Sequence, residues 1–125
     1  MQLKKEWEEY RIIEKAVMKY LNRLIPTNWY DMSLSQRIEW LKDERNVGTE
    51  KRTLVCVQEI VNESSEILAR VVDPNNKHVW NLVSSFIQSI RYPDGTRWYK
   101  KPNSVRIPLY GKQRIFVREK REKKE

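Results

Sequence analysis

Apolar residues recur at three- and four-residue steps through much of the first 90 positions, which is the spacing of one face of an α-helix. In residues 3–24 this face includes Ile13, Val17 and Leu24, and charged side chains fill the opposite face. Pro26 is expected to end the helix, because proline cannot continue the helical hydrogen-bond ladder. The helix could pack one stripe on a core, or it could join this domain to another.

A second helix is predicted for residues 33–44. Ser33 is a residue type that favours the N-cap position, and the apolar residues after it fall on one helical face. A polar loop that ends at Gly48 is expected to close this helix.

A wide apolar arc predicts a third helix over roughly residues 49–64. Its run TLVCV at 53–57 is rich in β-branched residues and could instead form a strand. The helix is favoured because Gln58 and Glu59 interrupt the run and the helical period then continues. A shorter helical segment is predicted for residues 65–71.

Residues 74–90 give the clearest local signal for a helix. Asp73 is a good N-cap, and proline is favoured at the first helical position that follows it. One face of this helix is apolar, and the other is polar with little charge. Such a polar face suits base edges and phosphates, and it equally suits a helix that faces solvent.

After Arg91 the period changes from helical to alternating, which is typical of strands. Short strands are predicted at residues 97–101, 105–109 and 113–118, with turns at Pro-Asp-Gly, Pro-Asn and Tyr-Gly-Lys. The final REKREKKE is a charge run that we expect to extend into solvent.

Helices first and a basic hairpin last predict a fold that is mainly α with a small C-terminal β-hairpin. Three helices followed by a β "wing" are the arrangement of a winged helix-turn-helix, in which the second helix of the turn enters the major groove and the wing touches the backbone. The three helices would be those at 51–63, 65–71 and 74–90. The expected parts of the chain are an N-terminal helical extension (1–45), a winged-helix domain (46–119) and a charged flexible tail (120–125).

Charge changes this picture of a plain helical domain. Residues 91–125 hold 12 Lys/Arg and 4 Asp/Glu, whereas residues 1–90 hold 13 of each, so the formal net charge of +8 lies entirely in the last segment. A neutral body with a basic end is typical of a protein that binds a polyanion, and nucleic acid is the commonest one.

The candidate DNA-binding residues are polar or basic and lie on the last helix and the hairpin. They are Lys77, Asn81, Ser84, Ser85, Gln88, Lys100, Lys101, Arg106, Lys112, Gln113, Arg114 and Arg118. The aromatic residues Trp98, Tyr99, Tyr110 and Phe116 could wedge against sugars or stack on unpaired bases. For Trp98 and Phe116 we favour the alternative that they pin the wing to the helices.

Several function classes are disfavoured by what the sequence lacks. It has no phosphate-binding glycine loop and no nucleophile elbow, and one cysteine with one histidine does not form an ordinary zinc site. The carboxylates are expected to lie on solvated helical faces, and Asp94 is the single acid between Arg91 and Arg118, so a metal-dependent nuclease is not favoured. We therefore expect no enzymatic activity and no cofactor.

Cys56 lies in an apolar run and is expected to be a buried, reduced thiol, which fits a reducing, cytoplasmic compartment. No apolar run approaches 18 residues, so no membrane partner is expected. The first residues, MQLKKEWEEY, have no apolar signal-peptide region.

Three separated segments resemble the C-terminal region of virulence-associated E proteins, which are prophage and mobile-island replication proteins with a helicase-type ATPase that is often linked to a primase. The segments are IPTNWYDMSLSQRIEWL at 25–41, GTEKRTLVCVQEI at 48–60 and YGKQRIFVRE at 110–119. Together with their spacing, they extend the resemblance over roughly residues 20–119.

The resemblance implies a DNA-binding appendage of a phage-type replicative helicase or primase, without catalytic residues of its own. Its partners would be DNA and the ATPase or primase domains of the same or an associated chain. Onto this chain it carries Arg52, a helix start at Thr49 and the core residues Val55, Cys56 and Ile60. It also carries the wing residues Tyr110, Gly111, Lys112, Gln113 and Arg114. Residues 61–64 depart from the family pattern, which leaves open whether the ligand is duplex, forked or single-stranded DNA.

A protein–protein docking module is the alternative function. Winged helices also dock other subunits, and the N-terminal amphipathic helix could pair with another helix while the charged end attracts an acidic partner. The bias of charge toward the wing favours nucleic acid over this alternative.

Overall fold

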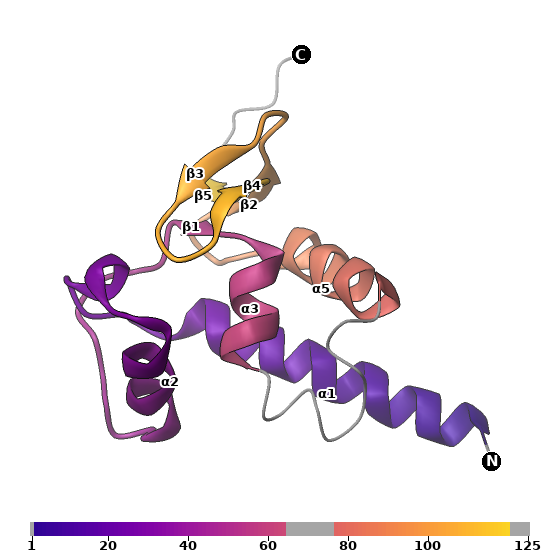
Figure 1. The fold of residues 1–125 in the computed structure, drawn as a ribbon. Coiled ribbons are helices and arrows are strands. Elements are labelled where there is room, and N and C mark those ends of the chain that lie inside the picture. The colour runs from indigo at the N-terminus through magenta and orange to yellow at the C-terminus, as the bar shows by residue number, and fades with distance from the viewer. Residues whose placement is uncertain (1, 65–76, 121–125) are drawn as a thin grey trace.

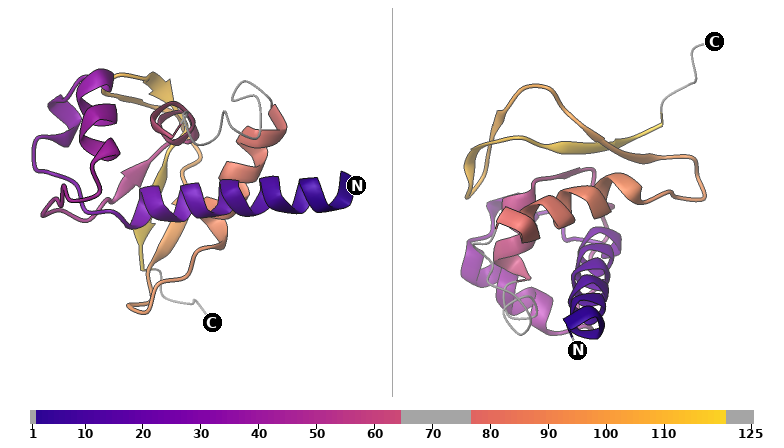
Figure 2. Two further views of the ribbon diagram at one scale, coloured as in Figure 1. Left: turned by 90° about the horizontal axis from the view of Figure 1, so that it is seen from below. Right: turned by 90° about the vertical axis from the view of Figure 1, so that its right-hand side faces the viewer.

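The computed structural model describes residues 2–64 and 77–120. It is a mixed α/β fold in which small antiparallel sheets cover one side of a group of helices (Figures 1 and 2). The helices are α1 (Gln2–Asn22), the 3-10 helix η1 (Trp29–Asp31), α2 (Leu34–Lys42), α3 (Val57–Glu63) and α5 (Lys77–Ser89). The strands are β1 (Leu54–Val55), β2 (Arg97–Lys100), β3 (Val105–Ile107), β4 (Gly111–Gln113) and β5 (Phe116–Glu119).

The strands form two antiparallel units. Strand β5 is central in a three-stranded sheet of order β1-β5-β2, with Tyr99 opposite Val117 and Leu54 on the other side of Val117. Strands β3 and β4 form a separate hairpin in the connection between β2 and β5. We use "wing" for β2 to β5, residues 97–119.

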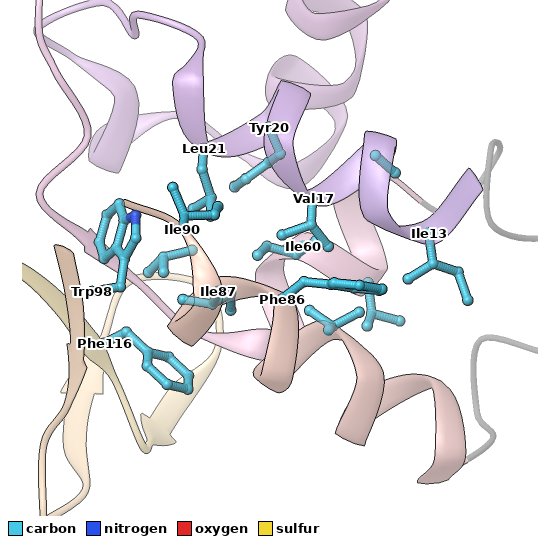
Figure 3. Packing of buried hydrophobic residues seen from close by; sticks show 14 of the residues in the cluster. Ile13, Val17, Tyr20, Leu21, Ile60, Phe86, Ile87, Ile90, Trp98 and Phe116 are labelled. Atoms are coloured by element: carbon cyan, nitrogen blue, oxygen red, sulfur yellow. The ribbon is translucent and has the colours of Figure 1, made fainter. Parts of the chain in front are cut away.

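The core lies between α1, α3, α5 and the inner face of the sheet (Figure 3). Trp98 and Phe116 project from β2 and β5 into this core and are buried, as the sequence indicated. Val17 of α1 and Ile60 of α3 belong to the same cluster. The core thus contains residues from both sides of the domain boundary that was expected after residue 45.

The predicted start of the second helix is confirmed. Ser33 caps α2 by accepting a hydrogen bond from the Gln36 backbone N–H at 3.2 Å, and the Gln36 side chain accepts one from the Ser33 N–H at 2.8 Å. This reciprocal pair is a capping box. At the other end, the guanidinium of Arg23, the residue after α1, donates to the carbonyls of Leu41 and Asp43 and so caps the C-terminus of α2.

The helix predicted to start at Thr49 or Glu50 is wrong in its first part. Leu54 and Val55 form a strand that pairs with β5, and helix α3 begins only at Val57 after an extended Cys56. The β-branched run that we weighed as a possible strand is therefore one. Its pairing with β5 places Val55 in the core and Leu54 on the outer face.

The predicted turns of the wing are displaced. The tight turn is Pro108 to Tyr110 and not Tyr110 to Lys112, and the segment expected as one strand at 113–118 is divided between β4 and β5. Pro108 has no N–H to offer a ladder, so it ends β3. The winged helix-turn-helix stays a prediction, because the helix expected at 65–71 and the Asp73-Pro74 start lie outside the described residues, as does most of the tail at 120–125.

Candidate nucleic-acid interface

The β3–β4 hairpin presents two cations side by side. Arg106 and Lys112 are directly opposite each other in the register, and both are exposed. The next residue along β3, Ile107, is buried against Cys56 and Ile115. Because side chains alternate between the faces of a strand, Arg106 and Lys112 point away from this contact. Their two charges therefore share the outer face of the hairpin.

Three further cations lie where β2 ends and β5 begins. The Lys101 N–H donates to the carbonyl of Ile115 at 2.9 Å, which places Lys101 beside the start of β5. The Arg114 guanidinium reaches the Pro102 carbonyl at 3.5 Å. Lys100 and Arg114 are exposed, and Lys101 is half-buried. We call Lys100, Lys101, Arg106, Lys112 and Arg114 the wing cations.

Arg118, predicted as a sixth member, is used within the fold. Its Nε donates to Thr96 Oγ1 at 2.8 Å, its Nη2 pairs with Asp94 at 3.3 Å, and its guanidinium lies 3.5 Å from the ring centre of Tyr92. It sits at the far end of β5 from Arg114. We therefore leave Arg118 out of the candidate interface.

The predicted polar face of α5 faces solvent. Lys77, Asn81, Ser85 and Gln88 are exposed and Ser84 is half-buried, and they fall on one side of the helix. The opposite side of α5 is buried, with Val83 and Ile87 in the core beside Trp98. Helix α5 and the wing are thus held on one shared core. Gln113 instead serves the wing itself, since its Nε2 donates to the Tyr110 carbonyl at 3.1 Å.

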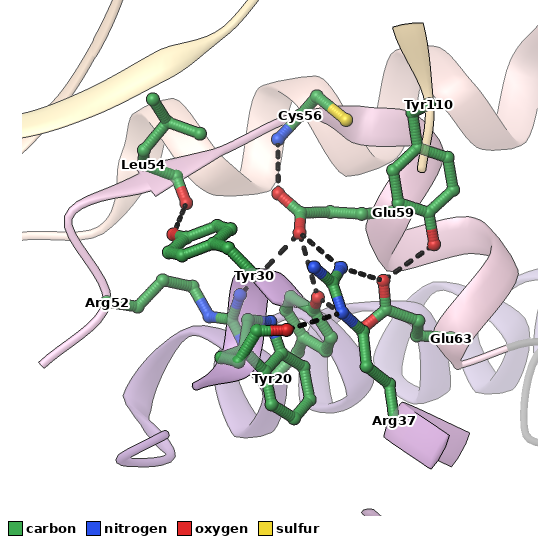
Figure 4. A network of polar contacts seen from close by, with 10 residues as sticks. Tyr20, Tyr30, Arg37, Arg52, Leu54, Cys56, Glu59, Glu63 and Tyr110 are labelled. Carbon is green, nitrogen blue, oxygen red and sulfur yellow. Dashed lines mark hydrogen bonds and ion pairs between the residues drawn. The ribbon is translucent and has the colours of Figure 1, made fainter. Parts of the chain in front are cut away.

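A buried polar network lies beneath the wing and was not predicted (Figure 4). Arg37, Arg52 and Glu59 are each 1% exposed, and Glu63 is 7% exposed. The expectation that the carboxylates are solvated is therefore wrong for Glu59 and Glu63. The available signal was their four-residue spacing, which places both on one face of the helix.

The network balances two guanidinium groups against two carboxylates. Arg37 Nη1 lies 3.2 Å from Glu63 Oε2 and 3.9 Å from Glu59 Oε2, and Arg52 Nη1 lies 3.6 Å from Glu59 Oε2. Arg52 also stacks 4.0 Å from the ring centre of Tyr20. A buried charge is tolerated only when it is paired and hydrogen-bonded, so these residues depend on one another.

One contact joins this network to the wing. Tyr110, in the turn of the β3–β4 hairpin, donates its hydroxyl to Glu63 Oε2 at 2.6 Å. Tyr20 of α1 donates to the other oxygen of the same carboxylate at 2.8 Å. Glu63 therefore connects the tip of the hairpin to the helical core, and it restrains where the wing cations can lie.

The network should make stability depend on pH. Burial raises the pKa of Glu59 to about 7, with Glu63 acting in the same direction and Arg52 opposing it. The ordinary value is 4.5, so between these two pH values the folded chain holds more protons than the unfolded one. The free energy of unfolding should therefore fall as the pH rises through this window, by at most about 1.4 kcal/mol per pH unit.

Urea unfolding at pH 5, 6, 7 and 8 measures this slope. Glu59→Gln removes the titrating group and should flatten the slope. Glu39→Gln changes an exposed carboxylate of α2 and should leave it as in the unmodified protein. Parallel slopes for the unmodified protein and Glu59→Gln would contradict the expectation.

Residues 2–64 and 77–120 contain no cluster of three or more His, Cys, Asp or Glu side chains that could hold a metal ion. Cys56 is buried as predicted, and burial raises the pKa of its thiol to about 12, so it is a poor nucleophile. Among the described helices, none has the length and apolar character needed to cross a membrane.

Comparison of the chain with protein-family models, with curated proteins and with solved structures finds no match. The assignment of function must therefore be argued from the geometry of the wing and of α5. The likeness of its segments to virulence-associated E proteins stays an expectation from the sequence.

Proposed function

We propose that this chain is a non-catalytic DNA-binding module, the C-terminal part of a prophage or mobile-element replication helicase or primase. The wing cations contact phosphates, and the polar face of α5 lies against the duplex. The observation that carries the proposal is the cross-strand pair Arg106 and Lys112, exposed on a hairpin whose other face is anchored through buried Ile107. A hairpin fixed in this way holds its charges in a defined direction, which a solvated tail does not.

A winged helix-turn-helix is the finer form of the fold that we propose. Helix α5 packs on both α1 and α3, and the wing follows α5 in the chain and packs against it. In this proposal α1 is one of the three helices and not an extension, α3 precedes the recognition helix, and α5 is that helix. Strand β1, which precedes α3, pairs with β5 of the wing as the third strand of its larger sheet.

Phosphate binding of this kind has a defined dependence on salt. Each phosphate neutralised by a cation releases condensed counterions, so five contacts would lower affinity by roughly 500-fold between 50 and 200 mM salt. Such contacts supply affinity and orientation without choosing a sequence. Any sequence preference would come from Asn81, Ser85 and Gln88 on α5, whose side chains suit base edges.

Removing the cross-strand pair tests the proposal. In Arg106→Ala with Lys112→Ala, affinity for a fluorescent duplex should fall and the slope of log affinity against log salt should decrease by about 2. Fluorescence anisotropy over a salt series measures both. The matched control is Arg11→Ala with Lys15→Ala, which removes the same charge from exposed positions on α1 and should leave the slope unchanged.

Two outcomes would overturn the proposal. One is a slope that changes equally in the wing and α1 variants, which would mean that net charge alone determines binding. The other is no binding of duplex, forked or single-stranded probes at low salt, which would favour the docking module. Unfolding curves of both double variants should match the unmodified protein, because all four side chains are exposed.

A further inference from the structure

The tip of the β3–β4 hairpin is apolar, exposed and strained. Leu109 has φ +72°, a left-handed conformation that leucine rarely adopts, and 48% of its surface is exposed. Pro108 beside it is also exposed. Neither side chain belongs to the two buried clusters or to the apolar residues packed on them. The fold of the described residues therefore gains little from an apolar side chain at this position.

The turn that carries Leu109 is held through the residue that follows it. Tyr110, the next residue, hydrogen-bonds through its hydroxyl to buried Glu63 at 2.6 Å, and its carbonyl accepts from Gln113 at 3.1 Å. These contacts keep the left-handed residue in place and aim it outward. Backbone strain that the surrounding structure maintains is typical of ligand clamps and switch regions.

The charges around the tip indicate what it would contact. Arg106 and Lys112 lie on the two strands just behind Pro108 and Leu109, so an apolar tip is backed by a cation on each strand. Proteins that bind the minor groove combine these two features: cations contact the groove and phosphates, and Leu, Pro or another apolar side chain enters between base steps. Binding a single strand by stacking would use an aromatic ring. The one aromatic residue of this turn, Tyr110, is half-buried with its hydroxyl bonded to buried Glu63, and the exposed residues Pro108 and Leu109 have no aromatic ring.

We infer that Leu109, supported by Pro108, is a wedge that enters a base step of duplex DNA and unstacks it. The inference rests on the proposed function and extends it, because it names the duplex as the ligand and the base step as the point of entry. Insertion should kink the duplex and should be easiest at flexible pyrimidine–purine steps. The wing cations would hold the backbone on either side.

A duplex with 2-aminopurine at a central TA step and dyes on both ends tests the wedge. Binding of the unmodified chain should raise the fluorescence of 2-aminopurine, since unstacking relieves its quenching, and should bring the two dyes closer. Leu109→Asn keeps a residue that tolerates the left-handed backbone but removes the apolar side chain. It should lose both signals and bind roughly tenfold more weakly, with an unchanged salt slope.

Two further variants control the test. Leu109→Met keeps an apolar side chain of similar volume on the same strained backbone and should retain both signals. Leu24→Asn removes an exposed leucine far from the wing in the chain and should behave as the unmodified protein. Thermal unfolding should show Leu109→Asn at least as stable as the unmodified chain, because asparagine relieves strain at this φ.

The outcomes separate the wedge from the proposed function. Duplex binding without a rise in 2-aminopurine fluorescence, or an equal loss in the Leu109 and Leu24 variants, would overturn the wedge and leave DNA binding by the cations intact. Absence of any duplex binding at low salt would overturn both.

Discussion

Arg37→Leu should lower the free energy of unfolding by about 3–5 kcal/mol. Arg37 is 1% exposed, and its guanidinium faces both Glu59 and Glu63. With Arg37 gone, two buried carboxylates share the single cation of Arg52, and neither can reach water. The leucine would restore apolar contact with Trp29 but not the lost charge. Urea unfolding at pH 7 measures the change.

An exposed cation provides the control. Lys42 lies 3.5 Å from Glu39 on the surface of α2, so Lys42→Leu removes an ion pair of the same kind in water and should cost less than about 0.5 kcal/mol. The double variant Arg37→Leu with Glu63→Gln should recover part of the loss, because it also removes one of the stranded carboxylates. If Arg37→Leu and Lys42→Leu lower the free energy of unfolding by similar amounts, the buried network does not function as a charge-balanced unit.

The sequence was informative where local signals determine structure. The Ser33 cap of α2 and the two faces of α5 depend on residues within a few positions of each other, and both are confirmed. The apolar stripe of the first helix is confirmed at Ile13 and Val17, but it is wrong at Leu24, because α1 ends at Asn22 and Leu24 is 36% exposed. The expectation that Trp98 and Phe116 pin the wing to the helices is also confirmed, since both are buried in the core. These features need no knowledge of distant partners.

Long-range pairing explains the error in the third helix. Leu54 and Val55 form a strand because β5, about 60 residues later, supplies the hydrogen bonds, and no periodicity within residues 53–61 contains that partner. The displaced turn of the wing has a local cause instead. Pro108 and a left-handed Leu109 make the turn two residues earlier than the Tyr-Gly-Lys sequence indicated.

The candidate interface was predictable in composition but not in detail. Charge segregation identified the wing, and alternation identified Arg106 as an outward residue. The role of Arg118 could not be read from the sequence, because Tyr92 and Asp94 approach it only after β2 and β5 pair. Burial of Glu59 and Glu63 likewise depends on cations from other parts of the chain, at positions 37 and 52.

Gly48→Ala should lower the free energy of unfolding by about 3 kcal/mol, through backbone contact alone. A β-carbon at position 48 would lie 2.1 Å from the carbonyl carbon of Ile25, and the neighbour cannot move aside because it is main chain. Three hydrogen bonds hold this approach: Ile25 N–H to Glu50 O, and Thr49 and Glu50 N–H to Ile25 O. Each contributes about 1 kcal/mol, and moving the backbone would strain all three.

The same three hydrogen bonds join the two ends of the chain segment that contains η1 and α2. Their loss should therefore also release Arg37 from its partners. Gly111→Ala is the matched control, since φ there is +71° but nothing lies within 4 Å of the new methyl group. It should cost about 1 kcal/mol from backbone strain alone. Urea unfolding of the two variants separates the effect of the steric contact at position 48 from that of the backbone strain at position 111. Equal losses in the free energy of unfolding would mean that the close approach of residues 25 and 48 does not limit stability.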